Sequence, residues 1–302
     1  MHASKEEHSS ADSNNTDSIL GLEVLSFAPK PLPTHQNFLS SLLNHMQEEV
    51  RPSIFAEFEL VLLTLFTGIQ DAISFPDYHC FASNQTGNTV FLMLAIVLPE
   101  FDGDMFITAN IGAALGFFLF AGWLTGQVSH LVGPRQRWWL VLCNLFQSAL
   151  VFAAAAIQYV YGTEKEGPAA VTVVALLAFA SGSQVVQSRS LAITEISTAM
   201  ATAAWVDLMI DPHMFTRDNR SRNRRLCFLV ALVLGTLVGA GIYKTAGSAP
   251  AIALSAAGKL LVTVMYLFNG SQEPKGDDIE AGSSCPSVLV SNSRDSSKPP
   301  LP

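Results

Sequence analysis

Long apolar runs separated by short polar stretches make up most of the chain between residues 58 and 268. Crossing a membrane as a helix takes roughly 20 apolar residues. Two runs are unsuited to crossing, because 89–98 is too short and 193–210 is interrupted by acidic and hydroxyl side chains. The pattern therefore predicts an all-α polytopic membrane protein with about six transmembrane helices and two short broken or re-entrant segments. The six predicted spans are 58–75, 106–128, 138–159, 169–186, 226–243 and 249–268.

The charges of the loops support this number of crossings. Arg135 and Arg137 lie between two of the long runs, and five arginines lie within 217–225. Loops rich in Lys and Arg stay in the cytoplasm, so both loops should lie on the same side of the membrane. An even number of crossings must separate them, but three runs lie between them, so one of the three does not cross. We take this to be 193–210, because it is the poorest in apolar residues and polar at its start. Both termini are then expected in the cytoplasm, and the acidic loop at 100–104 is expected outside.

Polar residues interrupt the first long run and make it the main candidate for a functional segment. Gln70 and Asp71 fall inside the run, and Pro76 is expected to break the helix. A carboxylate and amides at membrane depth cost free energy unless partners or a function compensate. The predicted substrate- or ion-binding residues of this half are Gln70, Asp71, Asn84, Thr86, Gly87 and Asn88.

Two roles are open for Asp71 and two for the polar stretch that follows it. Asp71 either faces a polar cavity, where it binds a cation or carries a proton, or is held by Arg189 or the amides as a structural bridge. In the polar stretch, backbone N–H groups at the start of a short helix could hold an anion or a substrate carboxylate. Alternatively, Thr86 or Asn88 caps that helix.

Motifs of the first half recur in the second half in the same order. Gly68-Ile-Gln70 recurs as Gly182-Ser-Gln184, and Thr86 has a counterpart near Thr198. The predicted site residues of the second half are Gln184, Gln187, Arg189 and Thr198.

Glycine pairs recur as well: Gly112-xxx-Gly116 matches Gly235-xxx-Gly239, and both pairs are expected to pack helices together. Each half would hold three crossings and one short segment. An odd number of crossings turns the second half upside down, so the repeat is expected to be inverted. The predicted organisation is a disordered or amphipathic N-terminal tail (1–56), two membrane repeats (57–162 and 163–270) and a disordered C-terminal tail (271–302).

The two halves contain a wider set of motif residues: Gly68, Asp71, Ala72, Phe81, Asn84, Thr86, Gly87, Asn88, Val90, Gly182, Gln184, Arg189, Thr194, Thr198, Gly235 and Gly239. These motifs resemble those of a known family, the YoaK-like membrane proteins or domain-of-unknown-function family 1275. The chain departs from that pattern at Ala199, where a Thr-Gly pair is usual. The resemblance implies an integral membrane protein of several spans, described as a permease without an established substrate. The Ser-rich N-terminal tail is similar to fungal members.

Composition narrows the function class. Only 14% of the residues are charged, against roughly 25% in soluble domains. The four cysteines are far apart, no metal-ligand spacing occurs, and no motif of nucleophilic catalysis is present. We therefore expect no cofactor, no metal and no nucleic-acid partner, and an enzyme is the less favoured reading.

The expected partners are the lipid bilayer and an unknown small solute, with a homo-oligomer possible. The favoured function is a small-solute transporter or permease whose polar site is formed by broken helices. The alternatives are a membrane-embedded enzyme and a lipid-binding or structural membrane protein without transport.

Overall fold

The structure, a computed structural model, describes residues 35–270 of the 302-residue chain. The chain divides into two units, residues 1–45 and 46–302. In the first unit the described residues form the start of α1 (His35–Gln47), which lies in the N-terminal tail. The expected disorder of residues 1–33 and 271–302 lies outside the described residues.

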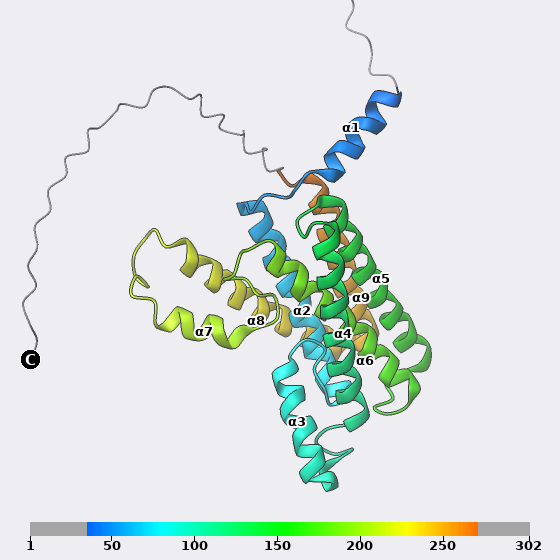
Figure 1. Cartoon of the computed structure of the whole chain (residues 1–302). Coiled ribbons are helices and arrows are strands. Elements are labelled where there is room, and N and C mark those ends of the chain that lie inside the picture. Colours follow the sequence, from blue (N-terminus) through cyan, green and yellow to red (C-terminus); the bar gives the residue numbers. More distant parts are fainter. Residues whose placement is uncertain (1–34, 271–302) are drawn as a thin grey trace, which may run out of the picture. The chain divides into compact units, whose positions relative to one another are not determined.

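Six long helices form the described part of the second unit (Figure 1). Each is long and apolar enough to cross a membrane. The two short apolar segments become short helices, α3 (Gln85–Val97) and α7 (Ala201–Met209). The prediction of six spans and two short segments is therefore confirmed. The long helices are α2 (Ile54–Tyr78), α4 (Thr108–Val132), α5 (Arg137–Tyr161), α6 (Pro168–Ser190), α8 (Arg220–Ala246) and α9 (Ser248–Met265), and short 3-10 turns follow α3 (η1, Pro99–Phe101) and α9 (η2, Tyr266–Phe268).

The predicted break at Pro76 is wrong. Pro76 lies inside α2, which ends at Tyr78 because His79 takes a left-handed conformation with φ 53°. Proline removes one helical hydrogen bond. So close to the C-terminal end of a 25-residue helix, that loss does not end it.

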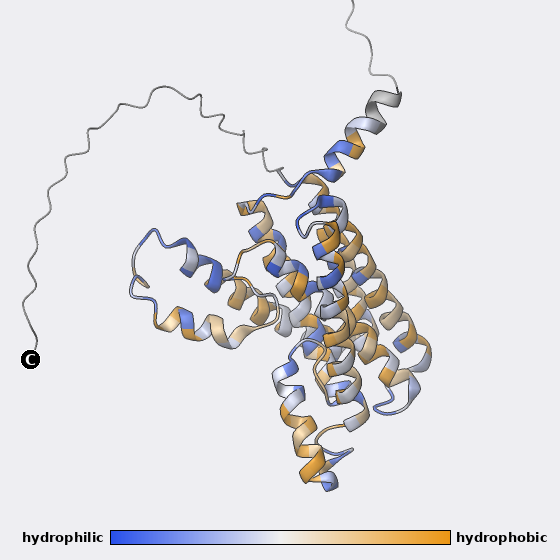
Figure 2. Cartoon of the chain, viewed as in Figure 1, coloured by the Kyte–Doolittle hydropathy of each residue, from blue (hydrophilic) through white to orange (hydrophobic). Residues whose placement is uncertain are grey.

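Apolar and polar positions are distributed as expected for helices in lipid. Figure 2 shows hydrophobic residues along the long helices and hydrophilic residues gathered in the turn between α7 and α8. Large apolar side chains of α4, including Phe117, Phe120 and Trp123, are exposed. Several amides and a lysine are fully buried instead. This arrangement, apolar outside with polar groups inside, indicates a helix bundle embedded in a bilayer.

Close packing joins α2 to α8 and α4 to α6. A Cβ added at Gly68 would lie 2.6 Å from the carbonyl oxygen of Leu232, and one at Gly182 would collide with the carbonyl of Phe118. Helix α5 packs against both α6 and α9, and α9 also packs against α2. The backbones approach most closely where glycines remove the side chain.

The Gly-xxx-Gly prediction holds for one pair only. Gly235 and Gly239 pack against α2, but a Cβ added at Gly112 or Gly116 would meet no atom within 4 Å. Helix α4 instead turns Ala114 and Ala121, both fully buried, toward the bundle. Small residues allow close approach, but the face that a helix presents to its neighbours decides whether they are used.

Candidate functional site

A layer of buried polar side chains lies midway along α2, where α2, α6 and α9 meet. At its centre is Lys259 of α9, whose side chain is 0% exposed. Its Nζ donates a hydrogen bond to Oε1 of Gln184 on α6. Nε2 of Gln184 in turn donates to Oγ1 of Thr67 on α2 at 2.9 Å. We call the residues Thr67, Gln70, Ser181, Gln184, Ser255 and Lys259 the central layer.

A second set of hydrogen bonds in the central layer runs from α2 back to α9. Nε2 of Gln70 donates to Oγ of Ser255 at 2.7 Å, and that hydroxyl donates to the carbonyl of Phe66 at 2.9 Å. Residues four apart share a helix face, so Ser255 lies one turn from Lys259. Oε1 of Gln70 and Oγ of Ser181 are both buried and have no hydrogen-bond partner among the described residues.

Helix α5 extends this polar region. Asn144 donates to the carbonyl of Lys259 at 2.8 Å and to Thr263 at 2.9 Å. Gln147 donates to Ser183 at 3.1 Å and to Gln187 at 3.0 Å, both on α6. Four helices therefore meet through buried amides and hydroxyls, which hold their relative positions in a membrane.

Lys259 was missed by the sequence analysis, although a signal was present. It is the only charged residue in the run 249–268. The reasoning that selected Asp71, a charge inside an apolar span, applies equally to Lys259. The described residues place no carboxylate within ion-pair distance of its Nζ, and an uncompensated buried charge costs several kcal/mol.

Asp71 does not join the central layer through any hydrogen bond. Its carboxylate accepts from the backbone N–H of Ser83 at 3.0 Å and from the Ser83 hydroxyl. It thus ties the last turns of α2 to the turn before α3. Arg189 is exposed, and its guanidinium lies 3.2 Å from Sδ of Met200. The alternative in which Arg189 holds Asp71 is therefore wrong.

The polar stretch before α3 folds back on itself. Asn88 is fully buried and bonds both backbone groups of Phe81, accepting at 2.9 Å and donating at 2.7 Å. A Cβ added at Gly87 would lie 3.1 Å from the Phe81 ring. Asn84 and Thr86 are exposed, and the N-cap position, Asn84, makes no side-chain capping bond. Capping by Thr86 or Asn88 is therefore wrong, since Asn88 closes the turn instead.

The predicted site residues thus fall into three places. Gln70 and Gln184 lie in the central layer, and Gln187 lies beside it. A second group surrounds the turn between α2 and α3: Asp71, Asn84, Thr86, Gly87 and Asn88. Arg189 and Thr198 lie where α6 connects to α7, and Thr198 is fully buried with a φ of 56°.

The thiol of Cys80 lies in the same turn after α2. Burial, assisted by the negative charge of Asp71, raises the pKa of Cys80 to about 12. The thiol stays protonated near neutral pH and packs as a small apolar group.

Each end of α2 carries a buried carboxylate that is bound to neighbouring helices. Near the start, Glu59 accepts from the side chain of Asn269 at 2.6 Å, and Arg137 donates to the carbonyl of Asn269 at 2.7 Å. We call this cluster the Glu59 closure. It lies about 12 Å along the helix axis from Thr67, at 1.5 Å per residue.

At the other end, Asp77 accepts from Gln158 of α5 at 2.7 Å and from the hydroxyl of Tyr243 of α8 at 2.9 Å. Gln158 also donates to Ser248 at 2.6 Å. We call this cluster the Asp77 closure. It lies about 10 Å along the axis from Gln70, so the central layer is situated between the two closures.

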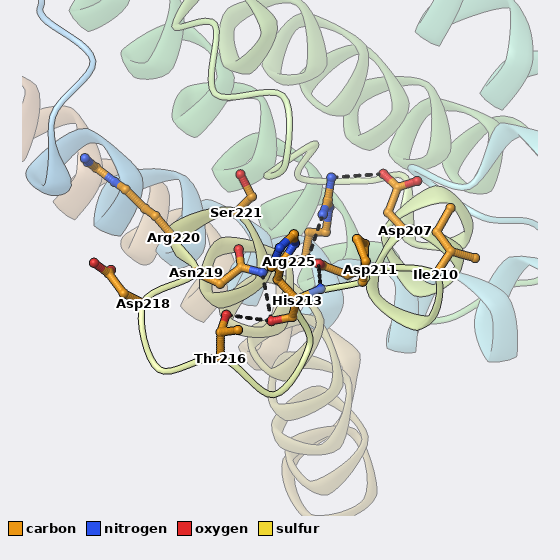
Figure 3. Close-up of a pocket in the computed structure, with 11 residues that line it drawn as sticks. Asp207, Ile210, Asp211, His213, Thr216, Asp218, Asn219, Arg220, Ser221 and Arg225 are labelled. Carbon is orange, nitrogen blue, oxygen red and sulfur yellow. Dashed lines mark hydrogen bonds and ion pairs between the residues drawn. The ribbon is translucent and has the colours of Figure 1, made fainter.

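A separate polar pocket of about 650 Å³ lies in the turn between α7 and α8 (Figure 3). Arg225 lies 3.6 Å from Asp207 and 3.8 Å from Asp211. Hydrogen bonds from the His213 backbone and the Asn219 side chain hold the pKa of Asp211 below its usual value. Arg225 is therefore paired with carboxylates of this region, whereas Arg220, which also lines the pocket, pairs with Glu57 of α2.

Neighbouring arginines are matched as well. Arg224 lies 2.7 Å from Glu57 of α2 and 3.2 Å from Glu195, and Arg220 also pairs with Glu57. Burial raises the pKa of Glu195, but hydrogen bonds, including one from Ser221, and the charge of Arg224 outweigh it and leave that pKa lowered. This network anchors α8 to α2.

Six apolar helices around a buried polar layer define a multi-pass integral membrane protein. Residues 60–265 match the model of the family described as "Protein of unknown function (DUF1275)". The match covers most of the chain, and the protein belongs to this family. No curated protein and no solved structure matches the chain.

Proposed function

We propose that this protein is a small-solute transporter and that the central layer is its solute site. The observation that carries the proposal is the position of this layer between the Glu59 closure and the Asp77 closure. A transporter needs a polar site near the middle of the membrane that is closed from each side in turn. In the structure described above both closures are formed, which would correspond to the occluded state of a transport cycle.

We also propose that residues 57–162 and 163–270 are inverted repeats. Helix α2 packs on α8, and its proposed counterpart α6 packs on α4, the proposed counterpart of α8. The shift along the sequence that carries Gly68 to Gly182 also carries Gln70 to Gln184 and Phe118 to Leu232. Each of the two glycines meets the backbone of the residue that this exchange requires.

Each closure contains one hydrogen bond that joins the two proposed repeats. Asn269 of the second repeat donates to Glu59 at one end of α2, and Tyr243 of the second repeat donates to Asp77 at the other end. Rocking of one repeat against the other would break one of these bonds while the other stays formed. The solute would then reach the central layer from one side at a time.

Cysteine accessibility tests this cycle without knowledge of the solute. In a variant lacking the native cysteines, Ser181→Cys is labelled with an impermeant maleimide in right-side-out and inside-out vesicles. We expect slow labelling from both sides, faster from one side with Glu59→Gln and faster from the other with Asp77→Asn. Phe215→Cys, at an exposed position of the turn before α8, is the control, and its labelling should not depend on either closure. Labelling from the same single side in all variants would overturn the proposal.

We further propose that both termini lie in the cytoplasm, supported by the arginines around 135 and 217–225. Single cysteines at Asp102 and Asp218 test it in intact cells. An impermeant reagent should label the first position and spare the second, and the reverse result would invert the orientation.

A further inference from the structure

We propose that the solute held in the central layer is a small oxyanion, such as a short carboxylate or an inorganic oxyanion, and that Lys259 binds its negative charge. The inference rests on the proposed function, because it concerns the same site. It begins from the charge of Lys259, which the described part of the chain does not neutralise.

The carboxylates of the spanning helices near the bundle interior are all engaged elsewhere. Glu59 is bound by Asn269, Asp71 by Ser83, and Asp77 by Gln158 and Tyr243. An ammonium group has three N–H donors, and Lys259 donates one of them to Oε1 of Gln184. Two donors and one positive charge are left for a ligand.

The groups around Lys259 suit an oxyanion. The amides of Gln70 and Gln184 each have a second N–H besides the one that bonds within the layer. The hydroxyls of Thr67 and Ser255 already donate to the carbonyls of Leu63 and Phe66. An oxyanion that accepts hydrogen bonds from these amide N–H groups and from the lysine forms charge-assisted bonds, which are stronger than neutral ones. The ligand would also supply the counter-charge that the buried lysine lacks.

The central layer offers acceptors as well as donors. Oε1 of Gln70, whose residue is 0% exposed, and Oγ of Ser181, 3% exposed, have no partner among the described residues. Unsatisfied buried acceptors cost free energy. An anion that also carries a hydroxyl, such as a hydroxycarboxylate or a protonated phosphate, would satisfy them.

The arginine cluster of the α7–α8 turn does not compete for this role. Arg225 faces Asp207 and Asp211, and Arg224 faces Glu57 and Glu195. An anion there would meet carboxylates as well as guanidinium groups. Lys259 is the basic group of the bundle interior that is left without a carboxylate in the described residues.

Binding to the purified full-length protein in detergent tests the inference. The probes are sodium acetate, sodium lactate, sodium sulfate and sodium phosphate at constant ionic strength, each followed by thermal shift and by calorimetry. We expect at least one probe to bind the native protein. Lys259→Met should weaken that binding about tenfold or more, because it removes a charged hydrogen bond. Carboxylate binding without sulfate or phosphate binding, or the reverse, identifies which of the two kinds of oxyanion the site takes.

Two further variants keep the test decisive. Lys259→Arg retains the charge and should retain binding better than Lys259→Met. If neither lysine variant folds, Gln70→Leu tests the site and should weaken binding, because it removes an amide donor of the central layer. Lys244→Met removes an exposed lysine at the end of α8 and is the matched control, which should bind as the native protein does. Unchanged affinity in Lys259→Met, or the absence of binding by all four probes, overturns the inference.

Transport is scored separately, by flux of the same labelled anions into proteoliposomes. Binding that depends on Lys259 without flux would support the anion site and contradict the transporter. Accessibility of the central layer from both sides, together with anion binding that Lys259→Met leaves unchanged, would support the transporter and contradict the anion site.

Discussion

Lys259 and Arg225 are both basic residues on membrane-spanning helices, yet their surroundings differ. Arg225 lies near the start of α8, with Asp207 and Asp211 less than 4 Å away. Lys259 is fully buried in the middle of the bundle, and its partner is a neutral amide. Matched charges hold a loop in place, whereas an unmatched buried charge is tolerated where something else supplies the counter-charge. The comparison favours the central layer over the polar pocket of the turn as the site of a charged ligand.

The largest expected effect concerns the close approach of helices on which the central layer depends. Gly182→Leu should destabilise the protein by about 3 kcal/mol or more, because the side chain meets the backbone of α4, which cannot move aside locally. Gly116→Leu is the matched control and should leave the melting temperature unchanged, since nothing lies within 4 Å of its Cβ position. Both are measured by thermal unfolding in detergent, and equal effects would contradict the packing assignment.

The second-largest effect is expected at Asp77, a buried carboxylate that accepts hydrogen bonds from two partners. Asp77→Asn should lower the free energy of unfolding by about 2 kcal/mol. Hydrogen bonds to a charged group contribute about 1.5–3 kcal/mol, and the asparagine has one acceptor oxygen in place of two, so either Gln158 or Tyr243 loses its acceptor. Tyr243→Phe, which removes one of the two bonds, should cost about 1 kcal/mol. Chemical denaturation or melting of the two variants measures both. A fully stable Asp77→Asn protein would show that the Asp77 closure is not formed in the membrane protein as isolated.

The direct comparison of the two basic residues should give effects of opposite sign. Without ligand, Lys259→Met should stabilise the protein by about 1 kcal/mol or more, because it removes an uncompensated buried charge. Arg225→Met should destabilise it by at most about 1 kcal/mol, since its partners are partly exposed. Melting temperatures in anion-poor buffer decide the sign. A Lys259→Met protein less stable than Arg225→Met would mean that the lysine is structural.

The smallest expected effect is the acid sensitivity of the α7–α8 turn. The pKa of Asp211 is lowered in the folded turn, so its contribution is present above the usual aspartate value of about 3.9 and is lost as pH falls through the lower folded value. A fluorophore on Phe215→Cys, an exposed site of the turn, should report the opening. Asp211→Asn should remove the transition, and a midpoint above the usual aspartate value would contradict the sign.

Hydropathy determined the number of spans and the two short segments, because the length of an apolar run is sufficient to identify a membrane helix. The same pattern selected Gln70 and Gln184, since amides inside apolar runs are conspicuous in any arrangement. It could have selected Lys259 on the same ground. These features depend on local composition, which folding does not change.

The hydrogen-bond partners of the buried polar side chains were decided by the tertiary structure alone. Asp71 accepts from Ser83 rather than from Arg189, and Gln184 accepts from Lys259, 75 residues away. Which of two similar glycine pairs packs was also undetermined by sequence, because it depends on the rotation of each helix about its axis. A rotation of half a turn exchanges the lipid-facing and buried sides without altering the hydropathy of the segment. The partners of a buried polar group are therefore fixed only when neighbouring helices dock.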